Sequence, residues 1–438
     1  MSEIKEKKQV YIGMVADFMH HGLINIINEA ARYGEVTVGL LTDKAVAEHK
    51  RLPLLTYDQR RAVVENIKNV ARVVPQDEWS YVENLRRYRP DYIIHGDDWQ
   101  NGSAAEIRND VYKVMEEIGG QVIEIPYTKD INSSRLAEEQ KAIGTTPEMR
   151  LKSLRRLMAA KPIVRIMEAH DGLSGLIIEN LTVEKDNCVK SFDGMWSSSL
   201  TDSTSKGKPD IEAVDLTTRL QSLNNILECT TKPIIYDGDT GGKIEHFVFT
   251  VRTLERHGIS AVIIEDKVGL KKNSLFGTDA QQTQDSVAHF CLKIRAGKEA
   301  QVTEDFMIIA RIESLIAGKP ISDAMERALA YVKAGADGIM IHSKNKEGDD
   351  IREFCETFRK IHPSVPLVVV PTTYDHVTET ELAKWGANIV IYANHMLRSA
   401  YPAMKQTAET ILLNERAEEA RPLCMPIKEI LELIPGTK

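Results

Sequence analysis

Apolar and polar positions alternate along the first third of the chain in a way that predicts strands separated by helices. Apolar, strand-like runs lie at 9–16, 35–43, 91–99 and 120–128, and a helical pattern at 22–34 ends at Gly34. Strands that alternate with helices form parallel sheets whose ligand sites lie at the carboxyl ends of the strands. We therefore predict an α/β fold for this part, a Rossmann-like domain over residues 1–140.

The second part of the chain carries a longer series of apolar strands separated by helical patterns. The apolar periodicity lapses between Leu136 and Thr146, where Thr146 and Pro147 are typical of a helix N-cap and first helical residue. About eight strand–helix units follow, which is typical of a (β/α)8 barrel. The barrel is predicted over 146–438, with strands in PIVRIMEAHD, CVKSFDGMWSSS, KPIIYDGDTGG, SAVIIEDK, DFMIIARIES, GIMIHSK, PLVVVPTT and NIVIYANH.

Charge, cysteine content and hydropathy argue against several classes of protein. The net charge of −8 argues against general binding of nucleic acid, which needs basic patches. The 5 cysteines are scattered without metal-ligand spacing, which is typical of reduced thiols in a cytoplasmic protein. No apolar stretch approaches the ~20 residues that a membrane helix needs. We expect a cytoplasmic enzyme that contacts neither nucleic acid nor membrane.

Polar side chains follow the predicted barrel strands at the same register. In a barrel of this type the carboxyl ends of the strands converge on one site. One charged residue after a strand is most often a solvated loop residue, but repetition over successive strands favours a shared site. The residues in question are Trp196 and Ser198, Asp237 and Asp239, Glu265 and Asp266, Arg311 and Glu313, His342 and Lys344, Thr372, and Asn394.

The carboxylates in this set predict a cation. Several acidic groups on one rim repel each other unless a positive charge lies among them, and hard oxygen ligands of this kind suit Mg2+. Arg311, Lys271 and His342 would then hold an anionic substrate, because a guanidinium binds carboxylate or phosphate in bidentate fashion.

Separated motifs in this part of the chain agree in order and spacing with one known family. They are GMWSSSLTDSTSKGKPD at 194–210, YDGDTGG, EDKVGLKKNS and ARIES. From about residue 150 onwards the sequence resembles the phosphoenolpyruvate mutases of the isocitrate lyase superfamily. The resemblance implies Mg2+-dependent interconversion of phosphoenolpyruvate and 3-phosphonopyruvate at the start of phosphonate biosynthesis. It also implies a homodimer or tetramer, to which the amphipathic segment 426–436 would contribute.

The resemblance assigns roles to individual residues of the rim. It implies that Asp237 is a direct Mg2+ ligand and that Asp239 and Glu265 hold its waters. The remaining implied roles fall into three groups: Asp210, Arg311 and His342 beside the phosphoryl group; Trp196, Ser198 and Leu200 as the wall around the pyruvate part; and Lys271, Asn273 and Ser274 on a gating loop.

The sequence of this loop differs from that of isocitrate lyases but is similar to that of phosphonopyruvate hydrolases. Isocitrate lyases carry a catalytic cysteine in a KKCGH-like motif, and here Lys271 and Lys272 are followed by Asn273. Carbon–carbon lyase chemistry therefore lacks its thiol. Phosphonopyruvate hydrolases share most rim residues and a similar loop, and they remain the nearest alternative.

The N-terminal part, from about residue 9 to 136, resembles the cytidylyltransferases. ADFMHHGLINII is similar to their HxGH motif at a helix N-terminus, a position that suits phosphate. The resemblance implies that CTP is a substrate bound by His20, Gly22, Lys50, Arg60, Asp97, Ser133 and Ser134. Leu23 replaces the second histidine of the motif, and Asn132 replaces the first serine of the later signature. A non-catalytic nucleotide-binding module is therefore the alternative to a second enzyme.

Overall fold

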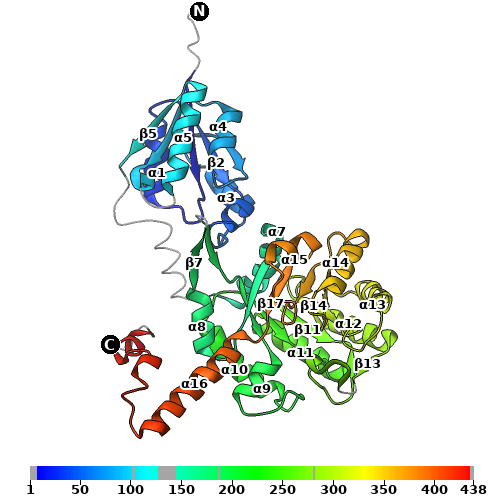
Figure 1. Ribbon diagram of the computed structural model, residues 1–438. Coiled ribbons are helices and arrows are strands. Elements are labelled where there is room, and N and C mark those ends of the chain that lie inside the picture. Colours follow the sequence, from blue (N-terminus) through cyan, green and yellow to red (C-terminus); the bar gives the residue numbers. More distant parts are fainter. Residues whose placement is uncertain (1–6, 101–103, 127–144, 186–187, 280–281, 435–438) are drawn as a thin grey trace, which may run out of the picture. The chain divides into compact units, whose positions relative to one another are not determined.

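The computed structural model describes residues 7–100, 104–126, 145–185, 188–279 and 282–434. The chain forms two compact units (Figure 1). One comprises Met1–Val164 with Leu181–Asp193, and the other comprises Arg165–Asn180 with Gly194–Lys438. The predicted boundary after Leu136 falls largely on 136–144, which lie outside the described residues.

The first unit contains a five-stranded parallel sheet, which confirms the predicted Rossmann-like fold. Its strand order is β3-β2-β1-β4-β5, so the chain starts in the middle and adds strands to both sides. The strands are β1 Gln9–Met14, β2 Glu35–Leu41, β3 Val70–Gln76, β4 Tyr92–Gly96 and β5 Gln121–Ile125. The helices are α1 His21–Ala30, α2 Asp43–Ala47, α3 Tyr57–Glu65, α4 Val82–Tyr88 and α5 Ala104–Ile118, with the 3-10 turn η1 Asp97–Gln100.

Strand β3 was not predicted from the sequence. It lies at the edge of the sheet, and only part of its length is buried, around Val73 and Val74. Arg72 and Pro75 interrupt the apolar pattern there. An edge strand tolerates proline because one side of its backbone has no strand partner. The apolar signal is correspondingly weak.

A close approach between two central strands explains one glycine of this sheet. A Cβ at Gly39 on β2 would lie 1.7 Å from the hydroxyl of Tyr11 on β1. That hydroxyl donates to Gln76 (2.8 Å) and accepts from Asn84 (2.9 Å), so it is held in place inside the sheet's core. No larger residue fits at position 39 without disturbing this buried polar contact.

Helix α7 (Pro147–Ala160) begins where the sequence predicts, with the Thr146 hydroxyl accepting from the Met149 amide at 3.4 Å. It belongs to the first unit and is tied to the loop before α3. Arg156 donates to the carbonyls of Leu54 (2.9 Å) and Pro53 (2.8 Å). The hairpin of β7 (Thr182–Lys185) and β8 (Cys188–Ser191) belongs to the same unit.

The second unit is a closed barrel of eight parallel strands, as predicted. Around the barrel the order is β10-β11-β14-β15-β16-β17-β6-β9. The strands are β6 Val164–Glu168, β9 Gly194–Ser197, β10 Ile234–Asp237, β11 Ala261–Glu265, β14 Met307–Ile312, β15 Gly338–Ile341, β16 Leu367–Val369 and β17 Ile389–Tyr392. The main helices are α8 Gly172–Asn180, α10 Leu216–Cys229, α11 Ile244–Arg256, α12 Val287–Ala300, α13 Ile321–Lys333, α14 Asp349–Ile361, α15 Glu379–Trp385 and α16 His395–Asn414.

Shorter helices and strands lie at the carboxyl ends of the barrel strands. Helix α9 (Ser199–Ser205) follows β9 directly, and a loop after β11 is closed at its neck by a small antiparallel pair. That pair is β12 (Lys267–Val268) with β13 (Thr283–Gln284), and the 3-10 turn η2 (Ser274–Asp279) lies between them. We call residues 268–279 the rim loop.

The barrel strands are apolar and buried on both faces, toward the barrel interior and toward the surrounding helices. Every residue of β11 is buried, and the helices turn one apolar face inward, as α11 does with Phe247, Val251 and Leu254. Gly297 of α12 lies so close to Phe247 that a Cβ would approach its ring to 2.5 Å. Buried on both sides, these strands give the continuous apolar runs that allowed the barrel to be predicted.

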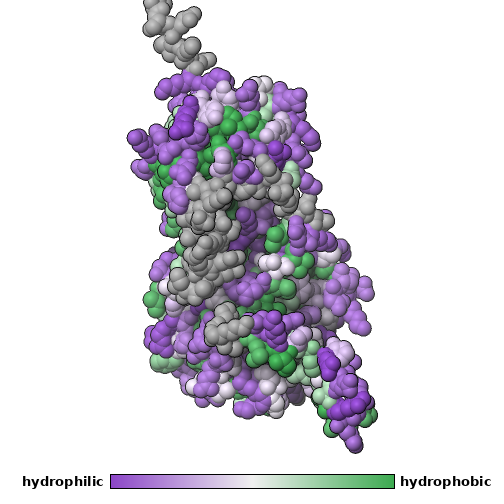
Figure 2. All heavy atoms as spheres, turned by 90° about the vertical axis from the view of Figure 1, so that its left-hand side faces the viewer, coloured by the Kyte–Doolittle hydropathy of each residue, from purple (hydrophilic) through white to green (hydrophobic). Residues whose placement is uncertain are grey.

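The C-terminal elements are different, because none of their residues is buried. Helix α16, the turn η3 (Arg421–Leu423) and helix α17 (Ile427–Glu432) all lack a buried residue. Large apolar side chains on them are exposed: Tyr401, Met404, Leu412, Leu413, Ile427, Ile430 and Leu431. On the face drawn in Figure 2, clusters of hydrophobic residues lie among hydrophilic ones. Among the described helices, none is both long and apolar enough to cross a membrane.

Candidate active site

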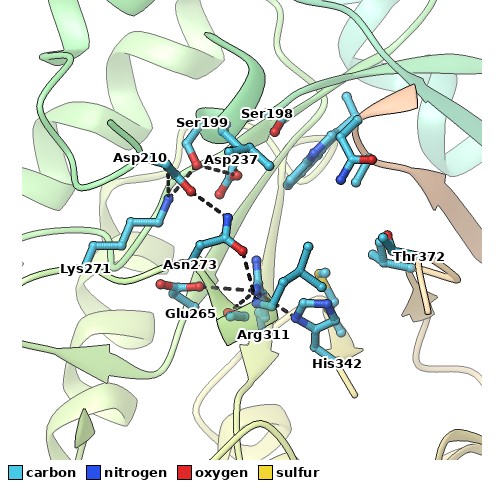
Figure 3. Close-up of a pocket in the computed structure, with 18 residues that line it drawn as sticks. Ser198, Ser199, Asp210, Asp237, Glu265, Lys271, Asn273, Arg311, His342 and Thr372 are labelled. Carbon is cyan, nitrogen blue, oxygen red and sulfur yellow. Dashed lines mark hydrogen bonds and ion pairs between the residues drawn. The ribbon is translucent and has the colours of Figure 1, made fainter. Parts of the chain in front are cut away.

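A cavity lies at the carboxyl ends of the barrel strands (Figure 3). Most of the barrel residues predicted to form the site line it, and four do not: Asp239, Asp266, Glu313 and Lys344. Asp266 is instead buried against Tyr331 (2.7 Å) and Arg327 (3.1 Å). The predicted residues found in the cavity are Trp196, Ser198, Leu200, Asp210, Asp237, Glu265, Lys271, Asn273, Ser274, Arg311 and His342. Ser199, Leu275, Met340, Val370, Thr372, Ala393 and Asn394 complete the lining.

Asp237 ends β10 and is fixed by the start of α9. Its Oδ2 accepts from the amide (3.1 Å) and the hydroxyl (2.9 Å) of Ser199, and its Oδ1 accepts from the Asp239 amide (3.2 Å). Burial acts to raise the pKa of Asp237, but Lys271 and Arg219 outweigh it and lower that pKa. Asp237 is therefore a buried carboxylate that stays ionised.

Asp239 is held in a backbone conformation that side chains seldom adopt. Its φ is 53°, in the left-handed region, and its carbonyl accepts from the Glu265 amide at 2.8 Å. Gly238 precedes it in a place where a Cβ would meet the Val262 side chain at 2.7 Å. The turn thus presses against β11 and directs both carboxylates of the Asp-Gly-Asp motif to the rim. Burial raises the pKa of Asp239.

Arg219 of α10 holds this turn through hydrogen bonds. It was not predicted as a site residue from the sequence. It donates to the Asp237 carbonyl (2.6 Å) and to Asp239 Oδ2 (3.1 Å), and it stacks over the ring of Tyr236. Its spacing from Leu223 and Ile226 places it on the buried face of α10. That spacing is the signal that could have found it, because buried arginines are almost always paired.

Neighbouring strands supply a second group of charges. Glu265 ends β11 and pairs in register with Arg311 of β14. The Arg311 guanidinium lies 3.4 Å from Glu265, donates to Glu313 at 2.6 Å, and meets His342 Nδ1 at 2.9 Å. Burial, opposed by Arg311, raises the pKa of Glu265 to about 7. Burial and Arg311 lower the pKa of His342, so the imidazole is neutral.

The rim loop reaches across the cavity to Asp210. Lys271 Nζ donates to Asp210 Oδ1 (2.8 Å), to the Ser199 hydroxyl (2.5 Å) and to Asp239. Asn273 Nδ2 donates to the other oxygen of Asp210 at 2.8 Å. Figure 3 shows Lys271 and Asn273 converging on Asp210 from the loop side. Burial acts to lower the pKa of Lys271, but Asp239 and Asp237 raise it, so the amine is an ammonium ion.

The carboxylates of this cavity are of the kind that binds Mg2+. The ammonium of Lys271 lies among them and balances part of their negative charge. In the part of the chain that the structure describes, no three acidic or imidazole groups are spaced to hold an ion in this arrangement. Instead Lys271 stands between Asp210 and Asp239. Asp237, Asp239 and Glu265 are buried carboxylates that offer the hard oxygen atoms Mg2+ prefers.

On the pyruvate side of the predicted site, β9 and α9 supply the wall. Trp196 is buried near the end of β9, and Ser198 follows as the N-cap of α9. The Ser198 hydroxyl accepts from the Thr201 amide at 3.4 Å. This bond leaves the hydroxyl's own proton available to a ligand in the cavity.

The predicted nucleotide-binding residues of the first unit have different surroundings. His20 is the N-cap residue of α1, where its side chain makes no capping bond, and Gly22 is buried within that helix. The Lys50 ammonium lies over the ring of Trp79 at 5.2 Å, and Asp97 is exposed at the start of η1. Ser133 and Ser134 lie outside the described residues.

Arg60 corrects the sequence-based interpretation. Its side chain is fully buried, and its guanidinium donates to the carbonyls of Val15 (2.5 Å) and Leu41 (2.8 Å) and to Asp43 (2.7 Å). A group committed to two carbonyls and a carboxylate inside the domain is not available to a nucleotide. We assign Arg60 to the core of the first unit.

Each of the two parts of the chain matches a known protein family. Residues 154–412 match the family described as "Phosphoenolpyruvate phosphomutase", and residues 11–139 match the family described as "Cytidylyltransferase-like". The phosphoenolpyruvate phosphomutase of Tetrahymena pyriformis is 36% identical over 281 residues, 64% of this chain and 89% of that protein.

Two solved structures resemble the barrel. The phosphoenolpyruvate phosphomutase of Streptomyces platensis subsp. rosaceus has a TM-score of 0.60 and 38% identity, covering 65% of this chain and 94% of that one. A phosphonopyruvate hydrolase in complex with oxalate and Mg2+ has a TM-score of 0.58 and 32% identity, with the same coverage of 65% and 94%.

Fold, cavity and relatives together define an enzyme of the phosphoenolpyruvate mutase/isocitrate lyase superfamily. Within that superfamily, the chain belongs to the phosphoenolpyruvate phosphomutase family. Its first unit is a cytidylyltransferase-like domain.

Proposed function

We propose that the barrel interconverts phosphoenolpyruvate and 3-phosphonopyruvate by intramolecular phosphoryl transfer. The observation that carries this proposal is the closed rim loop, which brings Lys271 and Asn273 onto Asp210. The reaction breaks the bond between phosphorus and the enol oxygen and forms one between phosphorus and C3. It consumes no water, so a site that shuts out solvent favours it.

The residues divide this work between them. Phosphoryl transfer proceeds through a loose, metaphosphate-like state, in which positioning and electrostatics provide most of the catalysis. Asp210 would guide the phosphoryl group, while Arg311 and neutral His342 hold its oxygens from the opposite side. Trp196, Ser198 and Leu200 would bound the pyruvate part, whose carboxylate takes a hydrogen bond from Ser198.

The acidic residues would hold Mg2+, with Asp237 as direct ligand and Asp239 and Glu265 bound to its waters. Bound there, Mg2+ supplies positive charge beside the enolate and phosphoryl oxygens. A relative whose structure contains oxalate and Mg2+ supports this assignment. Arg219 orients the Asp-Gly-Asp turn. An ion held here would compete with Lys271 for Asp239, so Lys271 would contact Asp239 only in the ion's absence.

Phosphonopyruvate hydrolysis is the alternative, favoured by the 32% identity to a hydrolase. Phosphorus NMR after incubating phosphonopyruvate with the enzyme and Mg2+ separates the two. We expect phosphoenolpyruvate to appear and inorganic phosphate to stay at the level of an enzyme-free control. Stoichiometric phosphate with pyruvate would instead establish the hydrolase.

The metal assignment predicts graded effects of two substitutions. Asp237→Ala removes the direct ligand and should abolish turnover together with Mg2+ binding measured by calorimetry. Arg219→Met leaves the ligands but frees the turn, and should weaken Mg2+ affinity by about 10- to 100-fold, as loss of a residue that orients metal ligands commonly does. Arg256→Met, on the exposed surface of α11, is the matched control. Unchanged Mg2+ affinity in Asp237→Ala contradicts the assignment.

For the first unit we propose CTP binding without efficient nucleotidyl transfer. Leu23 cannot donate a hydrogen bond to a developing phosphate charge, and loss of one such donor costs about 10^2- to 10^3-fold in rate. Arg60 is also withdrawn into the core. An active cytidylyltransferase acting on a phosphonate is the alternative.

Calorimetric titration with CTP, combined with a pyrophosphate assay in the presence of hydroxyethyl- or aminoethylphosphonate, tests this proposal. We expect saturable binding and pyrophosphate release no faster than without phosphonate. Rapid release that depends on the phosphonate would show the active enzyme, and absence of CTP binding would remove the nucleotide role altogether.

We also propose that the chain forms a homodimer or tetramer through its C-terminal helices. Their exposed apolar side chains include Leu412 and Leu413, at 78% and 83% exposure. Sedimentation equilibrium should give an oligomer for the natural chain and mostly monomer for Leu412→Asp/Leu413→Asp. Val302→Asp places a carboxylate on an exposed apolar residue elsewhere in the second unit, and should leave the oligomer intact. A natural chain that sediments as a monomer rules the proposal out.

A further inference from the structure

Lys267 is a buried cation to which the mechanism above gives no part. It stands at the neck of the rim loop, in β12, where it pairs in register with Gln284 of β13. Its side chain is 5% exposed. A lysine that is almost fully buried requires compensation for its lost hydration, so its partners indicate what it does.

The three protons of the Lys267 ammonium all go to the loop itself. Nζ donates to the Lys272 carbonyl (3.0 Å), the Ser274 hydroxyl (2.9 Å) and Gln282 Oε1 (2.9 Å). Lys272 and Ser274 lie on the outgoing limb of the loop, and Gln282 lies where the chain returns to β13. One ammonium group therefore joins the two limbs.

The positive charge of Lys267 is balanced by the barrel rather than by the loop. Its Nζ lies 3.2 Å from Glu265 and 3.3 Å from Glu313, at the ends of β11 and β14. The loop limbs are thus bound to a group that is itself bound to two fixed strands. Lys267 therefore ties both limbs of the loop to the barrel, beside the contacts that Lys271 and Asn273 make with Asp210.

Ser274 completes the connection. Its hydroxyl accepts from Lys267 (2.9 Å) and from Arg311 (2.6 Å), and it donates to Glu313 (2.5 Å). A hydroxyl has one proton and two lone pairs, so these bonds use its whole capacity. Although Ser274 lines the cavity, it has no bond left for a substrate while the loop lies here.

We propose that Lys267 and Ser274 form a latch that holds the rim loop closed over the substrate, and that both are positioning residues. The inference rests on the proposed function, in which closure keeps water from the phosphoryl group. With the latch broken, Lys271 and Asn273 would leave Asp210 for part of the time and solvent would enter. Water would then supply its oxygen to phosphorus as the carbon–phosphorus bond breaks and C3 takes up a proton, giving phosphate and pyruvate.

Hydrogen–deuterium exchange on the full-length protein tests the latch without relying on turnover. In Lys267→Met we expect the amides of 269–279 to exchange about tenfold faster than in the natural chain, while β11 and β14 stay protected. Lys272→Met is the matched control, because it removes an ammonium from the same loop but leaves the backbone carbonyl that Lys267 uses. Exchange in Lys267→Met equal to that of the control overturns the proposal.

The second readout is the product ratio from phosphonopyruvate, measured by phosphorus NMR. We expect Lys267→Met to raise the share of inorganic phosphate about tenfold and to lower the rate of phosphoenolpyruvate formation, with Lys272→Met unchanged. An unchanged product ratio in Lys267→Met, despite faster exchange of the loop, would overturn the link between latch and water exclusion. If the natural chain itself yields phosphate, the proposed mutase function fails, while loop exchange still decides the latch.

Gln282→Ala provides the variant to use if Lys267→Met does not fold. It removes one acceptor of Lys267 and the bonds from Gln282 to the Gly277 (3.0 Å) and Asn273 (3.4 Å) carbonyls, without unbalancing the buried carboxylates. We expect it to speed exchange of 269–279 about threefold, since the loop loses one ammonium bond and these two amide bonds. Exchange at the natural rate in Gln282→Ala would contradict the latch.

Discussion

Carboxylates gathered at one end of the barrel repel each other, and the arrangement of the cations and of the rim loop follows from that repulsion. Asp210, Asp237, Asp239, Glu265 and Glu313 lie within or beside a single cavity and are largely buried. Charges of one sign in a poorly hydrated site are unfavourable unless cations lie between them. Arg219 and Arg311, on a helix and a strand, supply fixed positive charge. Lys267, in β12 at the neck of the rim loop, and Lys271, in the loop itself, supply the remaining positive charge.

This division of the cations links loop position to the charge state of the site. The fixed arginines orient carboxylates whatever the loop does, as Arg219 does for the Asp-Gly-Asp turn. The lysine on the loop body neutralises the same carboxylates only when the loop is closed. Under the proposed function, a divalent ion and an anionic substrate would change that balance of charge, so their binding and the position of Lys271 would depend on each other. The fold provides the geometry, since parallel register sets Glu265 beside Arg311 on adjacent strands.

Much of this could be predicted from the sequence because the informative residues follow apolar strands. Asp237, Glu265, Arg311 and His342 each end a run that is buried on both faces, and a barrel brings such positions together. Spacing shows which face of an element a residue occupies, but it does not identify the residue's partner. Arg219 could have been recognised as buried, yet nothing in α10 indicates that it meets Asp239. Arg60 illustrates the converse, since an arginine in a motif that resembles a nucleotide site points into the core.

In the proposed function, Asp237, Asp239 and Glu265 would surround one divalent ion, and its binding would displace Lys271. The sharpest test is a crystal structure of the full-length protein with oxalate and with Mn2+ in place of Mg2+, in which the anomalous signal locates the ion. We expect one ion at about 2.1 Å from an Asp237 oxygen, with Asp239 and Glu265 bound to its waters and Lys271 Nζ withdrawn from Asp239. An ion bound elsewhere, or one bound here while Lys271 keeps its contact with Asp239, would refute this assignment.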